Sequence, residues 1–111
     1  MGEPYEIGQR ILAICTHIEK IEKRVAEFAK SEKLASALAE YDKAMEMAVA
    51  QLQSDGCPAT NIRDKAKGMC KEQLFLVKSL EIKWKAMLSI LEATKARLNG
   101  FQSYNKYLSE A

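Results

Sequence analysis

Ser-Asp-Gly-Cys-Pro at positions 54–58 is the only dense cluster of turn-forming residues in this chain of 111 residues. Gly56 suits the left-handed backbone conformation that ends many helices, and Pro58 suits the first position of a new helix, where its missing N–H costs nothing. About fifty residues stand on each side of this stretch. We therefore predict an all-α protein built as a long antiparallel helical hairpin, with a turn at 55–60.

The first arm, residues 1–54, carries two apolar rows at heptad spacing, which is typical of helices that pack in the manner of a coiled coil. The rows are Ile7, Ile11, Ile14, Ile18, Ile21, Val25 and Phe28, followed by Leu34, Leu38, Tyr41, Met45, Ala48 and Leu52. The step between the two rows is six residues rather than seven. Either one helix continues through a register defect, or a break near 30–33 lets Ser31 cap a second helix and gives a three-helix arrangement. The lack of Gly and Pro between Gly8 and Gly56 favours continuity or a mild kink over a true loop.

The second arm, residues 61–108, keeps the same spacing after a short helix that is expected to begin near Ala59. Gly68 predicts a kink or a helix end before the last long segment, and the pair at 99–100, Asn-Gly, predicts an interruption near its end. The row of this segment is Val77, Leu80, Trp84, Met87, Leu91, Thr94, Leu98, Phe101, Asn105 and Leu108.

The composition places the chain in one helical domain, 1–111, because it is too short for two ordinary domains. Only five Gly and two Pro, with 48% hydrophobic and 29% charged residues, exclude a disordered or collagen-like chain. No catalytic motif is present, so we expect neither an enzyme nor a cofactor. A net charge of +2 is too small for bulk electrostatic binding of nucleic acid, although it divides unevenly, with −2 in residues 1–54 and +4 in residues 55–111.

The apolar face of the second arm is wider than one neighbouring helix can cover. The residues that widen it are Leu74, Leu76, Ile82 and Ile90. A single hairpin would leave part of this face in water, and exposed apolar faces of that size normally mark interfaces. We therefore predict a homo-oligomer, with paired hairpins forming a bundle. The residues assigned to the oligomer interface are Ile7, Ile11, Ile14, Ile18, Ile21, Trp84 and Leu91.

The start of the helix after the turn is a candidate anion or nucleotide site. Free N–H groups there are accompanied by Thr60, Asn61, Arg63 and Lys67 within two turns. No glycine-rich phosphate loop is present, and the plainer interpretation is that Thr60 and Asn61 cap the helix. A candidate nucleic-acid surface consists of Lys67, Lys71, Lys78 and Lys85, of which the last three recur every seven residues. Its plainer interpretation is a solvated coiled-coil flank.

The three cysteines give no metal site, because Cys15, Cys57 and Cys70 have no C-x-x-C spacing and His17 is the only histidine. Cys57 precedes a helix start, which favours a thiolate, but no basic partner is identifiable, so no catalytic residue is assigned. No segment has the length or apolarity of a membrane span or signal peptide. We therefore expect no membrane association and a cytoplasmic location.

The stretch Gly-Cys-Pro-Ala-Thr-Asn-Ile at 56–62, followed by Ala-Lys-Gly at 66–68 and a long helix ending Leu-Asn-Gly-Phe-Gln-Ser at 98–103, resembles small helical proteins from phage and prophage early regions. The pattern is G-x-P-A-T-x-I…A-K-G, and it covers the C-terminal part of the chain but not the isoleucine row. The resemblance implies an accessory viral role in the host-cell cytoplasm, with no catalytic residues to assign. Our main hypothesis is a helical interaction protein that binds a host or phage protein. The alternatives are a nucleic-acid accessory protein and a nucleotide or anion sponge.

Overall fold

The computed structural model describes residues 3–110, and these residues form four α-helices and no strands. The helices are α1 (Glu3–Ser31), α2 (Lys33–Ser54), α3 (Ala59–Met69) and α4 (Lys71–Glu110). The predicted all-α class is confirmed. The chain divides into two compact units: unit 1 combines α1 with α4 from Trp84 onward, and unit 2 comprises Ser31–Lys83.

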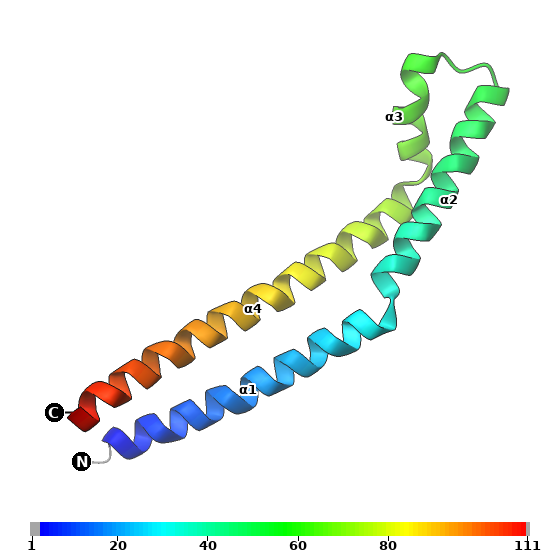
Figure 1. Ribbon diagram of the computed structural model, residues 1–111. Helices are drawn as coiled ribbons and strands as arrows, with labels where there is room; N and C mark the ends of the chain where they lie inside the picture. The colour runs from blue at the N-terminus through cyan, green and yellow to red at the C-terminus, as the bar shows by residue number, and fades with distance from the viewer. Residues whose placement is uncertain (1–2, 111) are drawn as a thin grey trace. The chain divides into compact units, whose positions relative to one another are not determined.

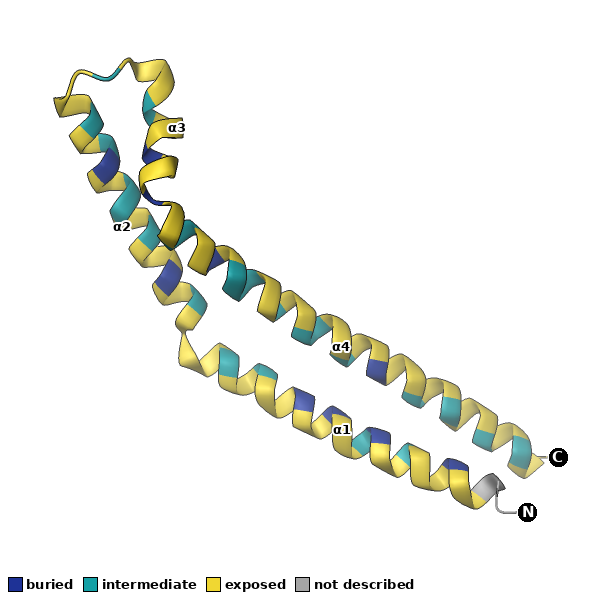
Figure 2. Cartoon of the chain, turned by 180° about the vertical axis from the view of Figure 1, so that it is seen from behind, coloured by how far each residue is buried: buried dark blue, intermediate teal, exposed yellow. Residues whose placement is uncertain are grey.

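Unit 1 is an antiparallel pair of helices, with the start of α1 and the end of α4 at the same end (Figure 1). Isoleucines of the first predicted row form its interior and are only 5–7% exposed: Ile7, Ile14, Ile18 and Ile21. These buried positions recur along one side of α1 (Figure 2). From α4, Thr94 is 5% exposed, and its hydroxyl donates a hydrogen bond of 2.7 Å to the Ile90 carbonyl. The buried hydroxyl is thereby satisfied within its own helix.

Aromatic contacts join the two helices of unit 1 at two levels. The rings of Phe28 and Trp84 stack with centroids 5.6 Å apart and an interplanar angle of 24°. Farther along, the Arg10 guanidinium carbon lies 6.0 Å from the centre of the Phe101 ring, which is within the range of a cation–π contact. Members of the isoleucine row of α1 and of the apolar row of α4 therefore hold these two helices together.

A single residue, Glu32, separates α1 from α2. Its φ of 55° and ψ of 19° are left-handed, which costs about 1–2 kcal/mol for a residue with a side chain. No side chain caps the new helix here, although the Lys33 N–H donates to the Ser31 hydroxyl at 3.4 Å. The Ser36 N–H already donates to the Glu32 carbonyl at 2.9 Å, so regular helical bonding resumes at once.

The C-terminus of α2 ends in a Schellman motif centred on Gly56, whose φ is +76°. The Gly56 N–H donates to the Gln53 carbonyl at 3.1 Å, and the Cys57 N–H donates to the Leu52 carbonyl at 3.0 Å, which are the two bonds that define this motif. Glycine adopts this conformation without the clash that a Cβ would cause. α3 begins at Ala59, as expected, and Pro58 is its N-cap residue rather than the first residue of the helix.

Unit 2 has an interior of small side chains. Ala48, Ala66 and Cys70 are 5%, 0% and 3% exposed and pack together, which lets α2 and the C-terminal part of α3 approach closely. Partly buried side chains of α2 surround this cluster: Tyr41, Ala44, Met45, Val49 and Leu52. The apolar row of α2 passes through Ala37, which is 5% exposed, and not through Leu38, which is 40% exposed.

Two expected interruptions lie elsewhere or do not occur. Gly68 lies inside α3, and the break before α4 falls at Cys70, where φ is −104° and ψ is 21°. The Cys70 N–H still donates to the carbonyls of Ala66 and Lys67, at 3.1 and 3.2 Å, so the chain bends while its hydrogen bonds are kept. At 99–100, Asn-Gly lies within α4, because packing of the neighbouring row outweighs the low helix propensity of glycine. No helix within residues 3–110 has the length and apolarity needed to cross a membrane.

Candidate functional site

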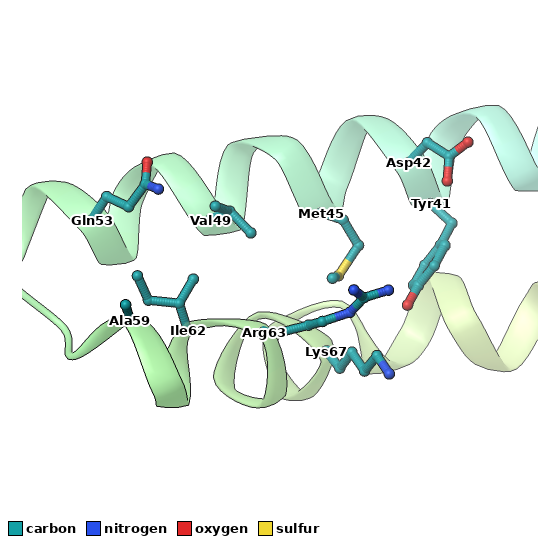
Figure 3. Close-up of a pocket in the computed structure, with 9 residues that line it drawn as sticks. All are labelled: Tyr41, Asp42, Met45, Val49, Gln53, Ala59, Ile62, Arg63 and Lys67. Atoms are coloured by element: carbon teal, nitrogen blue, oxygen red, sulfur yellow. The ribbon is translucent and has the colours of Figure 1, made fainter.

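A pocket of about 470 Å³ lies between α2 and α3 in unit 2 (Figure 3). Its α2 side consists of Tyr41, Asp42, Met45, Val49 and Gln53, and its α3 side consists of Ala59, Ile62, Arg63 and Lys67. The volume falls within the range of small-molecule sites, about 300–1,000 Å³. The pocket lies where the turn returns α3 antiparallel to the last turns of α2, next to the packed cluster of Ala48, Ala66 and Cys70 (Figure 1).

The pocket has an apolar part and a charged part. Val49 and Ile62 face each other across its middle, and Met45 continues the apolar wall (Figure 3). Arg63 and Lys67 are exposed and lie toward the end marked by Tyr41 and Asp42 (Figure 3). An amphipathic surface of this kind matches a ligand that has both an apolar body and a polar group.

The charges of the pocket are not paired with one another. Among the residues that the structure describes, neither Arg63 nor Lys67 has a carboxylate oxygen within 4.0 Å, and Asp42 has no cationic nitrogen within that distance. Arg63 and Lys67 are four residues apart on α3, so their like charges share one helix face and repel weakly. The charged end of the pocket therefore has a net charge of +1, and none of its charged groups forms an ion pair with another.

The structure brings together only part of the predicted anion site. Arg63 and Lys67 line the pocket, whereas Thr60 and Asn61 are exposed and lie outside its lining. Neither side chain caps α3, because its N-cap residue is Pro58 and no side-chain capping bond is made. The Asn61 N–H instead donates to the Pro58 carbonyl at 2.9 Å.

The α2 side of the pocket was missed by sequence reasoning. The spacing places Tyr41 and Met45 in an apolar row, and it gives Asp42 no role. The usable signal was the turn: a helix of 11 residues that folds back after Gly56 must lie against the last turns of α2.

The predicted lysine surface is exposed but is not one continuous row. Lys67 belongs to α3, and the break at Cys70 separates it from Lys71 and Lys78 on α4. Lys85 lies in unit 1, whereas the other three lie in unit 2. Lys78 Nζ is 3.8 Å from Glu81 Oε2, and its side chain is 63% exposed, so this surface ion pair contributes little stability.

The residues assigned to an oligomer interface are largely covered by the chain itself. The buried isoleucines of α1 are 5–7% exposed, and Ile11, Trp84 and Leu91 are partly buried within the same unit. Other large apolar side chains of α4 stay exposed. In its first part, within unit 2, Phe75 and Ile82 lie on the side away from the buried Val77, with Leu76 beside them, and we call these three residues the outer face. Phe75, Leu76 and Ile82 are 74%, 48% and 67% exposed.

The cysteines form no disulfide. Cys15 and Cys57 are partly buried and Cys70 is buried. Cys57 Sγ lies 3.8 Å from the Pro58 carbonyl oxygen, which is a weak local contact. Within residues 3–110, no group of three or more His, Cys, Asp or Glu side chains is placed to hold a metal ion.

Neither the family models, nor the curated proteins, nor the solved structures compared with this chain gave a match.

Proposed function

We propose that this chain is a non-enzymatic helical interaction protein that self-associates through the outer face of α4. The observation that supports this proposal most directly is the exposure of Phe75 and Ile82, at 74% and 67%, one heptad apart on the same helix. Val77, on the opposite side of α4, is 3% exposed and already packed. Two exposed apolar side chains on one side of a helix, when the other side of that helix is already buried, are the pattern expected of a subunit contact.

The charges beside the outer face predict how self-association depends on salt. Lys71 and Lys78 precede Phe75 and Ile82 by four residues each, so they form one flank of this face. When two copies meet through it with their α4 helices antiparallel, this flank of one copy faces the same flank of the other, so like charges approach one another. Added salt screens that repulsion, so the association should strengthen as ionic strength rises. Binding of an acidic partner through the same lysines would instead weaken as ionic strength rises.

The proposal is tested by the mass of the protein in solution, measured by static light scattering at micromolar concentration. The wild-type chain is expected to exceed the monomer mass of 12.5 kDa, and the double variant Phe75→Glu/Ile82→Glu is expected to be monomeric. Leu12→Glu is the matched control, because Leu12 is 61% exposed on a different helix. A monomeric wild type would overturn self-association. Dissociation by Leu12→Glu alone would overturn the assignment to α4.

A viral accessory role is the biological setting that we propose for this interaction. It rests on the G-x-P-A-T-x-I…A-K-G pattern at 56–68 and its resemblance to phage and prophage early-region proteins. In this setting the assembled protein would bind a host or phage protein in the host-cell cytoplasm. Purification of the tagged chain from infected cells, with Phe75→Glu/Ile82→Glu as the negative control, would identify that protein. Recovery of the same proteins by both forms would contradict a role for the outer face.

Nucleic-acid binding is a second candidate function, favoured by the exposure of Lys71 and Lys78 in unit 2. Binding through lysine and phosphate contacts weakens steeply as salt rises, which is opposite to the dependence expected for self-association. Gel retardation of single- and double-stranded DNA at low salt tests it. Retardation that is lost in Lys71→Glu/Lys78→Glu would support this function, and no retardation of the wild type would reject it.

A further inference from the structure

The pocket between α2 and α3 carries an inference that is independent of self-association. Its lining combines the apolar side chains of Met45, Val49 and Ile62 with the two cations Arg63 and Lys67. All of these residues lie in unit 2 and come from two helices joined by one tight turn. The apolar part and the cationic part are therefore held in one small site by a short stretch of chain.

The net charge of this site indicates which ligand charge fits it best. Arg63 and Lys67 contribute two positive charges and Asp42 contributes one negative charge, and no ion pair joins them. A single anionic group would neutralise the balance of +1 and relieve the repulsion between the two cations. A polyanion fits less well, because further negative charges would approach Asp42 and find no additional cation in the lining.

The apolar wall selects the rest of the ligand. An anion alone would leave Met45, Val49 and Ile62 in contact with water, whereas a hydrocarbon body would cover them. Thr60 and Asn61, the additional polar groups that a phosphate site would use, lie outside the pocket. We propose that this pocket binds an amphipathic monoanion, a carboxylate attached to a hydrocarbon chain or ring. Arg63 and Lys67 hold the carboxylate, and Val49 and Ile62 enclose the hydrocarbon.

The test compares four probes on the wild-type protein: octanoate, 1-octanol, acetate and adenosine monophosphate. Binding is followed by two-dimensional NMR of the methyl groups of Val49, Ile62 and Met45. Octanoate is expected to shift these methyl signals and to bind about tenfold more tightly than octanol, because only octanoate reaches the cations. Acetate is expected to leave them unchanged. Equal affinity for octanoate and octanol would overturn the role of the cations.

A stronger response to the nucleotide than to octanoate would overturn the ligand class and favour a nucleotide site. No shift with octanoate would overturn the proposal entirely. Both outcomes are separable from the mass measurement above, because they do not depend on whether the protein is monomeric.

Two variants locate the site. Arg63→Gln/Lys67→Gln should weaken octanoate binding about tenfold and leave octanol binding unchanged. Lys65→Gln is the matched control, because Lys65 is exposed on the same helix and does not line the pocket. Ala59→Phe, which adds a ring at the mouth while keeping every charge, should weaken both ligands. Folding of each variant is checked by circular dichroism, and octanoate binding that survives both variants would place it elsewhere.

Discussion

Unit 1 and unit 2 are built from the same kind of helix, but they fill their interiors with side chains of different size. In unit 1, isoleucines such as Ile14 and Ile18 are 7% exposed, and the Phe28 and Trp84 rings stack at 5.6 Å. In unit 2, the most buried side chains are those of Ala66, Cys70 and Val77, all smaller than isoleucine.

The difference shows two ways of stabilising a helix pair. Large side chains stabilise unit 1 through the apolar area that they remove from water. Small side chains stabilise unit 2 by allowing close helix contact, and larger apolar groups of α2, such as Tyr41 and Met45, are only partly buried around them. Other apolar groups of that unit are left to line its surface. Phe75 and Ile82 remain on the outer face of α4, and Val49 and Ile62 line the pocket. The unit with the smaller interior is therefore the one that carries both candidate binding surfaces.

The largest expected effect comes from shortening a core side chain of unit 1. Ile18→Ala should lower the free energy of unfolding by about 2–5 kcal/mol, because it removes buried methyl groups and leaves a cavity. Urea denaturation followed by circular dichroism measures the loss. Leu12→Ala, on the exposed side of the same helix, should change stability by no more than about 0.5 kcal/mol. Equal effects at the two positions would contradict the packing assigned to unit 1.

Enlarging a core side chain of unit 2 should have the next largest effect. Ala66 is 0% exposed, so Ala66→Leu has no space and should cost about 1–3 kcal/mol in the same denaturation experiment. Ala50→Leu is the control, because Ala50 is exposed on α2 and the added side chain meets no neighbour in its own unit. A neutral Ala66→Leu would show that α2 and α3 do not require close contact.

A smaller effect is expected from the aromatic pair that is special to unit 1. A double-mutant cycle with Phe28→Leu and Trp84→Leu should give a coupling energy of about 0.5–1.5 kcal/mol, beyond the area that each ring buries. The four unfolding free energies of the cycle provide the measurement. Additive single effects would mean that the stacked geometry contributes nothing beyond burial.

Two glycine substitutions, one in each unit, should give the smallest changes in the free energy of unfolding, and the two changes should be equal. Gly68 in α3 and Gly100 in α4 are helical, and a Cβ at either position would meet no atom within 4 Å. Gly68→Ala and Gly100→Ala should therefore each raise the free energy of unfolding by about 0.5–1 kcal/mol. Gains that differ strongly between the two would show that one glycine has a packing role.

Heptad spacing predicted the helices and the packed side of both long segments, because burial on a helix must repeat with its turn. Every member of the first row, from Ile7 to Phe28, is buried or partly buried. Spacing alone did not locate the buried position at Ala37. Leu38 is the more apolar of the two neighbours, so the pattern assigned the row to Leu38. The break before α4 falls at Cys70, two residues after the kink predicted at Gly68. The sequence pointed to Gly68 because glycine is a conventional helix terminator and a buried cysteine is not.

The candidate site was predicted in part, and the limit has a physical cause. Arg63 and Lys67 stand near a helix start, which is a local feature of the sequence. Tyr41 and Val49 reach the same pocket only through the fold of the turn, and that is a non-local consequence of Gly56 adopting φ +76°. The exposure of Phe75 also could not be predicted from local sequence, because it depends on which side of α4 packs against another helix.

The central claim, that the outer face of α4 is the contact between copies, is tested most directly by site-specific photo-crosslinking. The photoreactive residue p-benzoylphenylalanine is placed at position 75 in one protein and at position 12 in another, and each is irradiated at micromolar concentration. We predict that only the protein labelled at position 75 gives a covalent dimer of twice 12.5 kDa. A dimer formed only from position 12, or no dimer from either, would contradict the claim.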